Sequence, residues 1–280
     1  MSTPADGILP ILGFGTYQLT GNNAVDMVTH ALRVGYRHID TAQAYDNEAE
    51  VGQAILGSGL PRAHVFVTTK VWPDRFGRKD LPKSIDESLK KLGTDYVDLV
   101  LLHWPNPRIP LEETLDALVE VKQSGKTRHI GLSNYTTDLM EQAVEICGKG
   151  VLINNQVEYH PFLNQEIVIR KAHELGMSVT AYRPIAKGRV FKNDTLTQIA
   201  GHHNKSAAQV ALRWIIQQGI VAIPRSSKAD HVSENFDIFD FELSAKEMEA
   251  IGRLRGDNRL VSPGNLAPEW DLTEPVLAHR

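Results

Sequence analysis

Four polar residues in the first part of the chain have types and spacing that could do chemistry together. Asp40 ends the run G-Y-R-H-I-D, Lys70 lies in V-T-T-K-V-W, and His103 ends V-D-L-V-L-L-H. Tyr45 follows Asp40 by five residues. Short apolar runs of this kind are typical of buried β-strands that lead into loops. Because the unusual residue stands at the same end of each run, we expect one pocket shared by all four.

Their types indicate proton transfer to a carbonyl oxygen. A buried lysine is unfavourable unless it is paired, and Asp40 is the available counter-charge for Lys70. An ammonium beside the Tyr45 hydroxyl should lower its pKa toward the range where general acid catalysis works. We therefore expect Tyr45 to protonate a carbonyl oxygen while hydride reaches the carbonyl carbon. His103, expected to be neutral, would orient the same oxygen through a hydrogen bond.

Each of these residues also has an ordinary structural explanation. Asp40 could begin a helix as its N-cap, and the Lys70 side chain could reach the surface along its aliphatic part. His103 could be a core histidine with its hydrogen bonds satisfied, and Tyr45 a half-buried surface ring. The order of the four residues and their equivalent places at strand ends favour a shared catalytic site.

Composition excludes several classes of function. The chain of 280 residues is 42% hydrophobic and 23% charged, which is usual for a soluble globular protein. A net charge of −4 gives no basic surface, so we expect no nucleic-acid partner. No apolar run of about 18 residues or more and no basic leader at Met1 is found, so we expect a cytoplasmic protein without a membrane partner. Cys147 is the single cysteine, which excludes an internal disulfide and a thiolate metal cluster, and we expect it to be a core residue.

The elements that must position these residues alternate along the chain. Helical spacing covers 81–92, 111–124 and 165–175, and the capping boxes Ser206–Gln209 and Ser244–Glu247 predict two further helix starts. Apolar runs without polar alternation predict parallel strands that are covered on both faces. These runs lie near 36–40, 65–70, 97–103, 127–132, 151–156, 177–182, 220–224 and 237–241.

Eight strands that alternate with helices predict one α/β domain over residues 1–280, a (β/α)8 TIM barrel. Residues 7–19, two short apolar runs separated by glycines, predict an N-terminal β-hairpin ahead of it. Residues 255–280 lack periodicity and are expected to form a loop and tail. An open doubly wound sheet is the alternative, but no G-x-G-x-x-G opens a helix after any predicted strand.

Several segments closely resemble the aldo-keto reductases, in particular bacterial members like the 2,5-diketo-gluconate reductases. They are G-Y-R-H-I-D-T-A at 35–42, L-L-H-W-P at 101–105, G-L-S-N at 131–134, N-Q-V-E-Y-H-P at 155–161 and I-P-R-S at 223–226. The resemblance runs from Leu12 to Arg259 and implies a (β/α)8 barrel that binds NADPH without a metal. It also implies that Asp40, Tyr45, Lys70 and His103 are catalytic.

The same resemblance implies a set of cofactor-binding residues. Ser133, Asn134 and Gln156 would hold the nicotinamide carboxamide, and Tyr182 would stack on the nicotinamide ring. At the far end of the cofactor, the family usually shows I-P-K-S, an arginine and then E-N. Here the second arginine is replaced by His231, so we expect NADPH binding with unusual tolerance for NADH. The remaining expected cofactor residues are Thr16, Arg225, Ser226, Lys228, Glu234 and Asn235.

A second departure follows the strand near 177–182. The usual A-Y-S-P-L-G of the family reads A-Y-R-P-I-A-K-G here, which introduces Arg183 and Lys187. Either residue could contact the cofactor pyrophosphate or an acidic substrate, and Arg183 could also be simply solvated.

Aromatic residues beside the catalytic positions predict the character of the substrate pocket. Tyr17, Trp72 and Trp104 would form an aromatic wall, Asn47 would add a polar contact, and Trp270 would approach from the C-terminal loop. Such a wall favours small to medium carbonyls, namely aldehydes, α-keto aldehydes, keto esters and keto sugars. The resemblance thus implies an NAD(P)H-dependent carbonyl reductase. No surface apolar stripe stands out in the sequence, so we expect a monomer. A regulatory barrel that binds NADPH without turnover is the alternative, and net alcohol oxidation by the same residues stays open.

Overall fold

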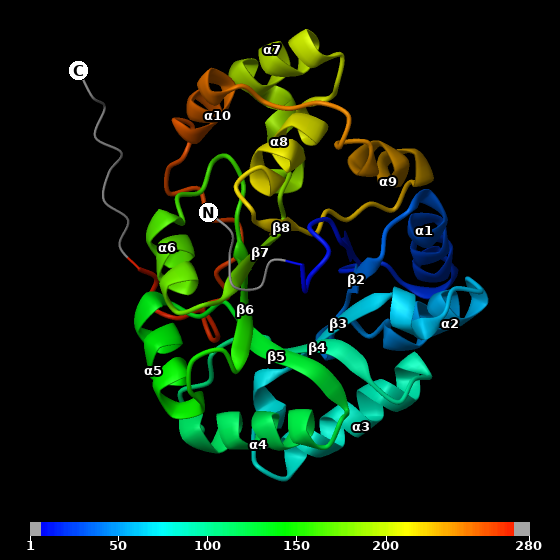
Figure 1. Cartoon of the computed structure of the whole chain (residues 1–280), viewed down its shortest axis with the longest axis vertical. Coiled ribbons are helices and arrows are strands. Elements are labelled where there is room, and N and C mark those ends of the chain that lie inside the picture. Colours follow the sequence, from blue (N-terminus) through cyan, green and yellow to red (C-terminus); the bar gives the residue numbers. More distant parts are fainter. Residues whose placement is uncertain (1–6, 272–280) are drawn as a thin grey trace.

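A computed structural model describes residues 7–271. Eight parallel strands form one sheet in the order of the chain, and the helices lie around it (Figure 1). The strands are β1 (Phe14–Gly15), β2 (His38–Asp40), β3 (Phe66–Val71), β4 (Val97–Leu102), β5 (Thr127–Ser133), β6 (Leu152–Glu158), β7 (Ser178–Tyr182) and β8 (Val221–Ala222). The helices are α1 (Gly21–Val34), α2 (Glu48–Gly57), α3 (Asp80–Leu92), α4 (Leu111–Gln123), α5 (Thr137–Cys147), α6 (Glu166–Glu174), α7 (Asp194–His203), α8 (Ala207–Ile216), α9 (Ala229–Phe236) and α10 (Ala245–Gly252).

The two edges of the sheet meet, which makes it a barrel. Leu12, just before β1, forms a parallel bridge with Ala222 of β8. The Gly13 amide donates to the Ala222 carbonyl at 2.8 Å, and the Ala222 amide donates to the Ile11 carbonyl at 3.0 Å. The predicted (β/α)8 class is confirmed. Because all strands are parallel, their carboxyl ends open at one end of the barrel, where such folds place their sites.

Apolar side chains fill two separate layers. The larger cluster lies between the strands and the helices, and α3 contributes Leu81, Ile85, Leu89 and Leu92 to it at helical spacing. The smaller cluster lies inside the barrel, because alternate residues of a strand face opposite sides of the sheet. Its buried members are Leu9, Leu99, Leu101, Ile153, Val221 and Ile223.

Local signals in the sequence located several helix ends correctly. The capping boxes at Ser206 with Gln209 and at Ser244 with Glu247 are both formed, and they begin α8 and α10. In each box the serine hydroxyl accepts the amide of the third helical residue, which satisfies a backbone donor that the helix itself leaves free.

Two predictions about the strands differ from the structure. Residues 237–241 are not a strand: Asp237 and Asp240 instead bind the ammonium of Lys205 at 2.7 and 2.8 Å. The Asp237 carbonyl accepts a hydrogen bond from the Gln209 side-chain amide at 2.7 Å. This segment is therefore bound to α8 and to the loop between α7 and α8. The eighth strand of the barrel is instead β1 (Phe14–Gly15), which lies within the predicted hairpin and pairs in parallel with β2. An N-terminal hairpin is not clearly shown.

Glycine is required where β1 approaches the barrel interior. A Cβ added at Gly13 would lie 2.6 Å from Nδ1 of His38. The His38 ring is buried, and its Nε2 is 3.0 Å from Oγ1 of Thr68 on the neighbouring strand. Burial lowers the pKa of His38 from 6.5 to about 4, since a charged imidazole would lose its hydration there.

Buried His38 predicts a pH-dependent stability. Below pH 6.5 the unfolded chain binds a proton that folded His38 does not take up until about pH 4. The free energy of unfolding should therefore fall with decreasing pH in this window, by roughly 1 kcal/mol per pH unit from this residue. Urea unfolding at several pH values should show a shallower dependence for His38→Gln. The exposed control His64→Gln should keep the wild-type slope, and an unchanged slope in His38→Gln would contradict this role.

Candidate active site

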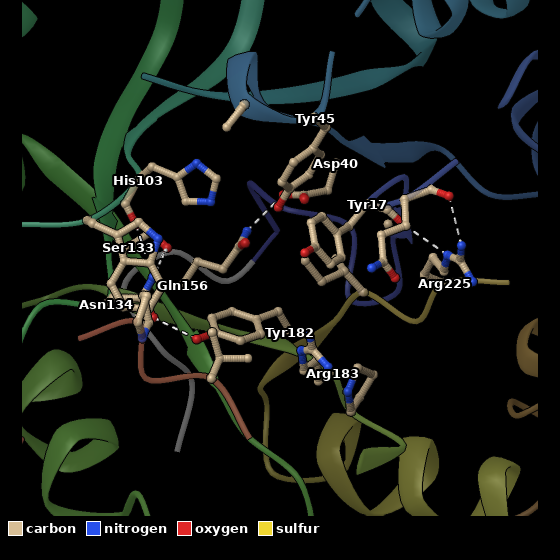
Figure 2. Close-up of a pocket in the computed structure, with 18 of the residues that line it drawn as sticks. Tyr17, Asp40, Tyr45, His103, Ser133, Asn134, Gln156, Tyr182, Arg183 and Arg225 are labelled. Carbon is tan, nitrogen blue, oxygen red and sulfur yellow. Dashed lines mark hydrogen bonds between the residues drawn. The ribbon is translucent and has the colours of Figure 1, made fainter. Parts of the chain in front are cut away.

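The four residues singled out for chemistry meet at the carboxyl end of the barrel. Asp40 is the last residue of β2, and Tyr45 ends a short 3-10 helix, η1 (Gln43–Tyr45). Lys70 lies in β3, and His103 directly follows β4. Asp40, Tyr45 and His103 line a cavity of about 640 Å³, and Figure 2 shows their side chains directed toward it. Parallel strands bring these separate stretches to one edge, as the sequence predicts.

Lys70 is fully buried and has three acceptors for its ammonium protons. Its Nζ is 2.5 Å from Oδ1 of Asp40, 2.9 Å from the Thr41 carbonyl and 3.4 Å from Oη of Tyr45. The second Asp40 oxygen accepts the Gln156 amide at 2.8 Å. The ammonium is therefore neutralised by one carboxylate and directed at the phenol oxygen.

The electrostatics of Tyr45 differ from the sequence-based expectation. Burial raises the pKa of Tyr45 well above its ordinary value, and the charges of Asp40 and Tyr17 add to this, while Arg183 opposes it. The predicted decrease was wrong, because it neglected the burial of the phenol and because Asp40 offsets the lysine. Burial also lowers the pKa of Lys70, against the opposing effect of Asp40.

His103 has the surroundings of a neutral hydrogen-bonding group. Burial lowers the pKa of His103 well below its ordinary value, and the Lys70 charge lowers it further. Its Nδ1 is buried and has no hydrogen-bond partner among residues 7–271. The ring meets Trp72 edge-on at 5.2 Å and Tyr45 at 5.6 Å between centroids. The imidazole is thus held by ring packing, and its hydrogen-bonding capacity is not used up by the described part of the chain.

A polar cluster from β5, β6 and β7 forms the opposite wall. Ser133, Asn134, Gln156 and Tyr182 all line the cavity. Oδ1 of Asn134 accepts the Tyr182 hydroxyl at 2.8 Å, and its amide donates to the His103 carbonyl at 3.0 Å and to Ser133 Oγ at 3.1 Å. Asn134 has φ 64°, a left-handed conformation that asparagine tolerates better than most residues.

Three cationic side chains also line the cavity: Arg183, Lys187 and Arg225. The Arg225 guanidinium donates to the backbone carbonyls of Tyr17 at 2.8 Å and Gln18 at 2.9 Å (Figure 2). Within residues 7–271, neither Arg183 nor Lys187 forms a salt bridge. Their charge is therefore available for an anionic group.

The other residues predicted for the cofactor lie beyond this cavity wall. Ser226 accepts the Lys228 amide at 3.1 Å, ahead of α9. The side chains of Lys228 and His231 are exposed, and Asn235 is buried in α9. Glu234 is half-buried on the same helix. Thr16 is also not part of the wall: it is buried, and its hydroxyl donates to the Asp40 carbonyl at 3.0 Å.

The aromatic wall is present in part. Tyr17, Trp72 and Trp104 line the cavity, and the Tyr17 ring meets Tyr45 at 5.0 Å. Trp270 does not line the cavity, and its ring contacts Trp104 at 6.2 Å between centroids.

The prediction that Asn47 contacts substrate was wrong. Its side chain is fully buried, and its amide donates to the carbonyls of Thr16 at 2.8 Å and Leu19 at 2.9 Å. Its oxygen accepts the Thr41 hydroxyl at 2.7 Å. Asn47 thus fixes the loop after β1 to the loop after β2.

Part of the cavity wall was missed in the sequence. Val261, Pro263 and Leu266 line the cavity from the segment after α10. This segment has no helical or strand period, so its pattern predicts only a loop.

Backbone conformation is a further feature of the site. Four residues line the cavity with φ between 52° and 64°: Gln18, Asn134, Arg183 and Lys187. Such left-handed residues often gather at functional sites.

Comparison with known proteins places the chain in a family. The model of the Aldo/keto reductase family matches residues 11–255. The chain belongs to this family. Methylglyoxal reductase DkgB from Escherichia coli O157:H7 is 43% identical over 265 residues, which cover 94% of this chain and 99% of the relative. An aldo-keto reductase from Mycobacterium avium is 40% identical over 91% of this chain and 90% of its own length.

Solved structures agree with this assignment. A crystal structure provisionally named as a 2,5-diketo-D-gluconic acid reductase B has 48% identity and a TM-score of 0.93, covering 96% of this chain and 97% of its own. The Bombyx mori aldo-keto reductase in complex with NADP has 33% identity and a TM-score of 0.84 over 91% and 92%. This aldo/keto reductase is therefore an NAD(P)H-dependent oxidoreductase that reduces carbonyl groups. Among residues 7–271, no helix is long and apolar enough to cross a membrane, and no group of three or more potential ligands could hold a metal ion.

Asn47 provides a test that separates structure from substrate binding. Asn47→Asp keeps the shape but replaces two amide protons with a carboxylate oxygen that faces two carbonyls. The free energy of unfolding should fall by roughly 1–3 kcal/mol, with KM for the carbonyl substrate little changed. The exposed control Asn23→Asp should stay within about 0.5 kcal/mol of wild type in urea unfolding. A normal stability with a raised KM would restore Asn47 to the substrate site.

Proposed function

We propose that Tyr45 donates the proton to the carbonyl oxygen during reduction. The contact that carries the proposal is Lys70 Nζ at 3.4 Å from Tyr45 Oη, inside a site where Lys70 is fully buried. Because burial raises the pKa of Tyr45, the phenol holds its proton until the carbonyl oxygen gains negative charge. The Lys70 ammonium then stabilises the phenolate that remains, and Asp40 keeps that ammonium in place.

His103 would orient the carbonyl oxygen. Its lowered pKa keeps the imidazole neutral near pH 7, so one ring nitrogen carries a proton that it can donate. The ring lies edge-on to Tyr45, and both side chains line the same cavity. A carbonyl oxygen between these two rings would receive two hydrogen bonds, which strengthen as negative charge develops on it.

The polar wall fits a nicotinamide nucleotide. When bound, a reduced nicotinamide supplies the hydride that reaches the carbonyl carbon. Ser133, Asn134 and Gln156 offer a hydroxyl and two side-chain amides, the groups that match a carboxamide, and the Tyr182 ring offers a face for stacking. The cavity of about 640 Å³ lies within the usual size range of ligand sites.

We further propose NADPH as the cofactor, with tolerance for NADH. Arg183, Lys187 and Arg225 supply positive charge along the cavity. The guanidinium of Arg225 is already bound to the carbonyls of Tyr17 and Gln18, so a phosphate would have to compete for it. His231, which stands where the family usually has its second arginine, is exposed on α9. Ser226, Lys228, Glu234 and Asn235, on or next to α9, complete the proposed adenosine end, while Thr16 would contribute only through the backbone it supports.

The proposed substrates are small to medium carbonyl compounds such as α-keto aldehydes, keto esters and keto sugars. Tyr17, Trp72 and Trp104 give an aromatic wall, and the relative named methylglyoxal reductase supports a small carbonyl. The four proposed catalytic groups lie together, and several relatives are named as reductases, so a regulatory barrel without turnover is not favoured. We expect a cytoplasmic protein with one domain. We also expect a monomer, because the exposed large apolar side chains belong to different segments, namely Tyr17, Leu56, Ile146, Phe191 and Phe239.

Removal of the Tyr45 hydroxyl tests the proton donor. Tyr45→Phe should lower kcat by about 10²–10⁴ while the Kd for NADPH stays nearly unchanged. NADPH oxidation followed at 340 nm with small aldehydes measures kcat, and quenching of tryptophan fluorescence measures cofactor binding. Tyr96→Phe, which removes a hydroxyl at the opposite end of the barrel, is the control. Near-native kcat in Tyr45→Phe would show that another group supplies the proton.

Cofactor discrimination tests the proposed phosphate end. The ratio of kcat/KM for NADPH over NADH should stay below about a thousandfold, roughly 4 kcal/mol. His231→Arg should raise this ratio, because an arginine adds a charged fork suited to a phosphate. His202→Arg, at the end of α7, adds the same charge elsewhere and serves as the control. A wild-type ratio above a thousandfold would refute the proposed tolerance for NADH.

A further inference from the structure

Glu158 is a buried carboxylate that the proposed proton transfer does not use. It is the last residue of β6, and its side chain is fully buried. It belongs to the segment N-Q-V-E-Y-H-P, in which only Gln156 has a proposed role at the cavity. A buried carboxylate is expensive unless hydrogen bonds compensate it, so its partners should indicate what it does.

The partners of Glu158 are two consecutive backbone amides and one histidine. Oε1 accepts the Leu260 amide at 2.7 Å, and Oε2 accepts the Val261 amide at 2.8 Å. Nε2 of His160 lies 3.0 Å from Oε1. Because Nδ1 of His160 accepts the Phe162 amide at 3.2 Å, the ring proton is on Nε2 and is donated to Glu158. Three donors, two of them from one short loop, therefore converge on this single carboxylate.

The loop bound by Glu158 is the wall that the sequence pattern did not reveal. Val261 lines the cavity, and so do Pro263 and Leu266 further along. The loop is also fixed at its far end, where Asp271 accepts the Thr137 amide at 3.2 Å at the start of α5. Between these points the segment has few backbone hydrogen bonds of its own, and the Trp270 ring packs on Trp104. The two carboxylates therefore hold its two ends.

We propose that Glu158 is a positioning residue that fixes the C-terminal wall of the substrate cavity through the Leu260 and Val261 amides. The proposal rests on the proposed function, in that the carbonyl compound is taken to bind in this cavity. Glu158→Gln is nearly isosteric, but it turns one acceptor into an NH₂ group that must face a backbone N–H. The wall should then move away from the cavity while β6 and the groups around Lys70 remain in place.

Amide hydrogen exchange followed by NMR tests the anchor directly in the wild-type protein. The Leu260 and Val261 amides should be protected, and in Glu158→Gln they should exchange roughly tenfold faster or more. KM for a small aldehyde should rise by a similar factor, while the Kd for NADPH and kcat stay within about threefold of wild type. Glu166→Gln removes the same charge from the exposed face of α6, where the carboxylate lies 3.4 Å from Arg255, and should change none of these values.

Leu260→Pro removes one donor from the loop side without altering β6, and it should raise KM in the same way even if Glu158→Gln fails to fold. Unprotected Leu260 and Val261 amides in the wild-type protein would overturn the proposal, and so would an unchanged KM in Leu260→Pro. Because hydrogen exchange does not require turnover, these results are distinct from a failure of the proposed reaction, which would appear as an inactive wild-type protein.

Discussion

The ammonium of Lys70 has no access to water, and its charge must be met entirely by the protein. Its contact with Asp40 at 2.5 Å supplies the counter-charge. The Thr41 carbonyl and the Tyr45 hydroxyl oxygen accept its other two hydrogen bonds. An isolated buried ion costs several kcal/mol, and removing one partner of such a pair leaves the other uncompensated. The positions of Asp40, Thr41 and Tyr45 are therefore dictated by one buried charge.

The barrel satisfies this constraint through strand register. Asp40 of β2 is aligned with Thr68 of β3, so Lys70 lies two residues further on and on the same side of the sheet. Across the barrel, Gln156 of β6 donates to the second Asp40 oxygen and prevents the carboxylate from turning away. The phenol is thus held beside a cation whose charge is already balanced, which explains why burial decides the direction of the Tyr45 pKa. The same principle recurs at Glu158, where a buried carboxylate is met by backbone amides and so fixes a loop.

Sequence patterns predicted those features that depend on local residue order. Residue runs that end in Asp40, Lys70 and His103 identified three strands and one shared cavity, and the capping boxes located α8 and α10. The first barrel strand was predicted as part of a hairpin ahead of the barrel, because Phe14–Gly15 is too short to show the pattern of a barrel strand. The glycines of this stretch indicated a turn, whereas Gly13 is needed for close packing on His38.

Other features depend on contacts between distant segments, which a single sequence does not reveal. Asn47 follows Tyr45 closely, but its amide is used by the Thr16 and Leu19 carbonyls. The wall at Val261 has no periodic pattern, and its position follows from Glu158, about a hundred residues earlier in the chain. The pKa of Tyr45 depends on how far the effect of burial exceeds that of nearby charges. Burial and distances to charges are set by the fold and cannot be derived from residue order alone.

We infer that the buried Lys70–Asp40 pair lies beside a Tyr45 phenol that stays protonated at neutral pH. An NMR titration with ¹³Cζ-labelled tyrosine, with the Tyr45 signal assigned by its loss in Tyr45→Phe, measures this state directly. We expect the Tyr45 signal to keep the chemical shift of the protonated phenol from pH 6 to beyond the ordinary pKa of tyrosine, about 10. Titration of this signal near pH 7 would contradict this inference, because the Lys70 ammonium would then affect the pKa of the phenol more strongly than burial does.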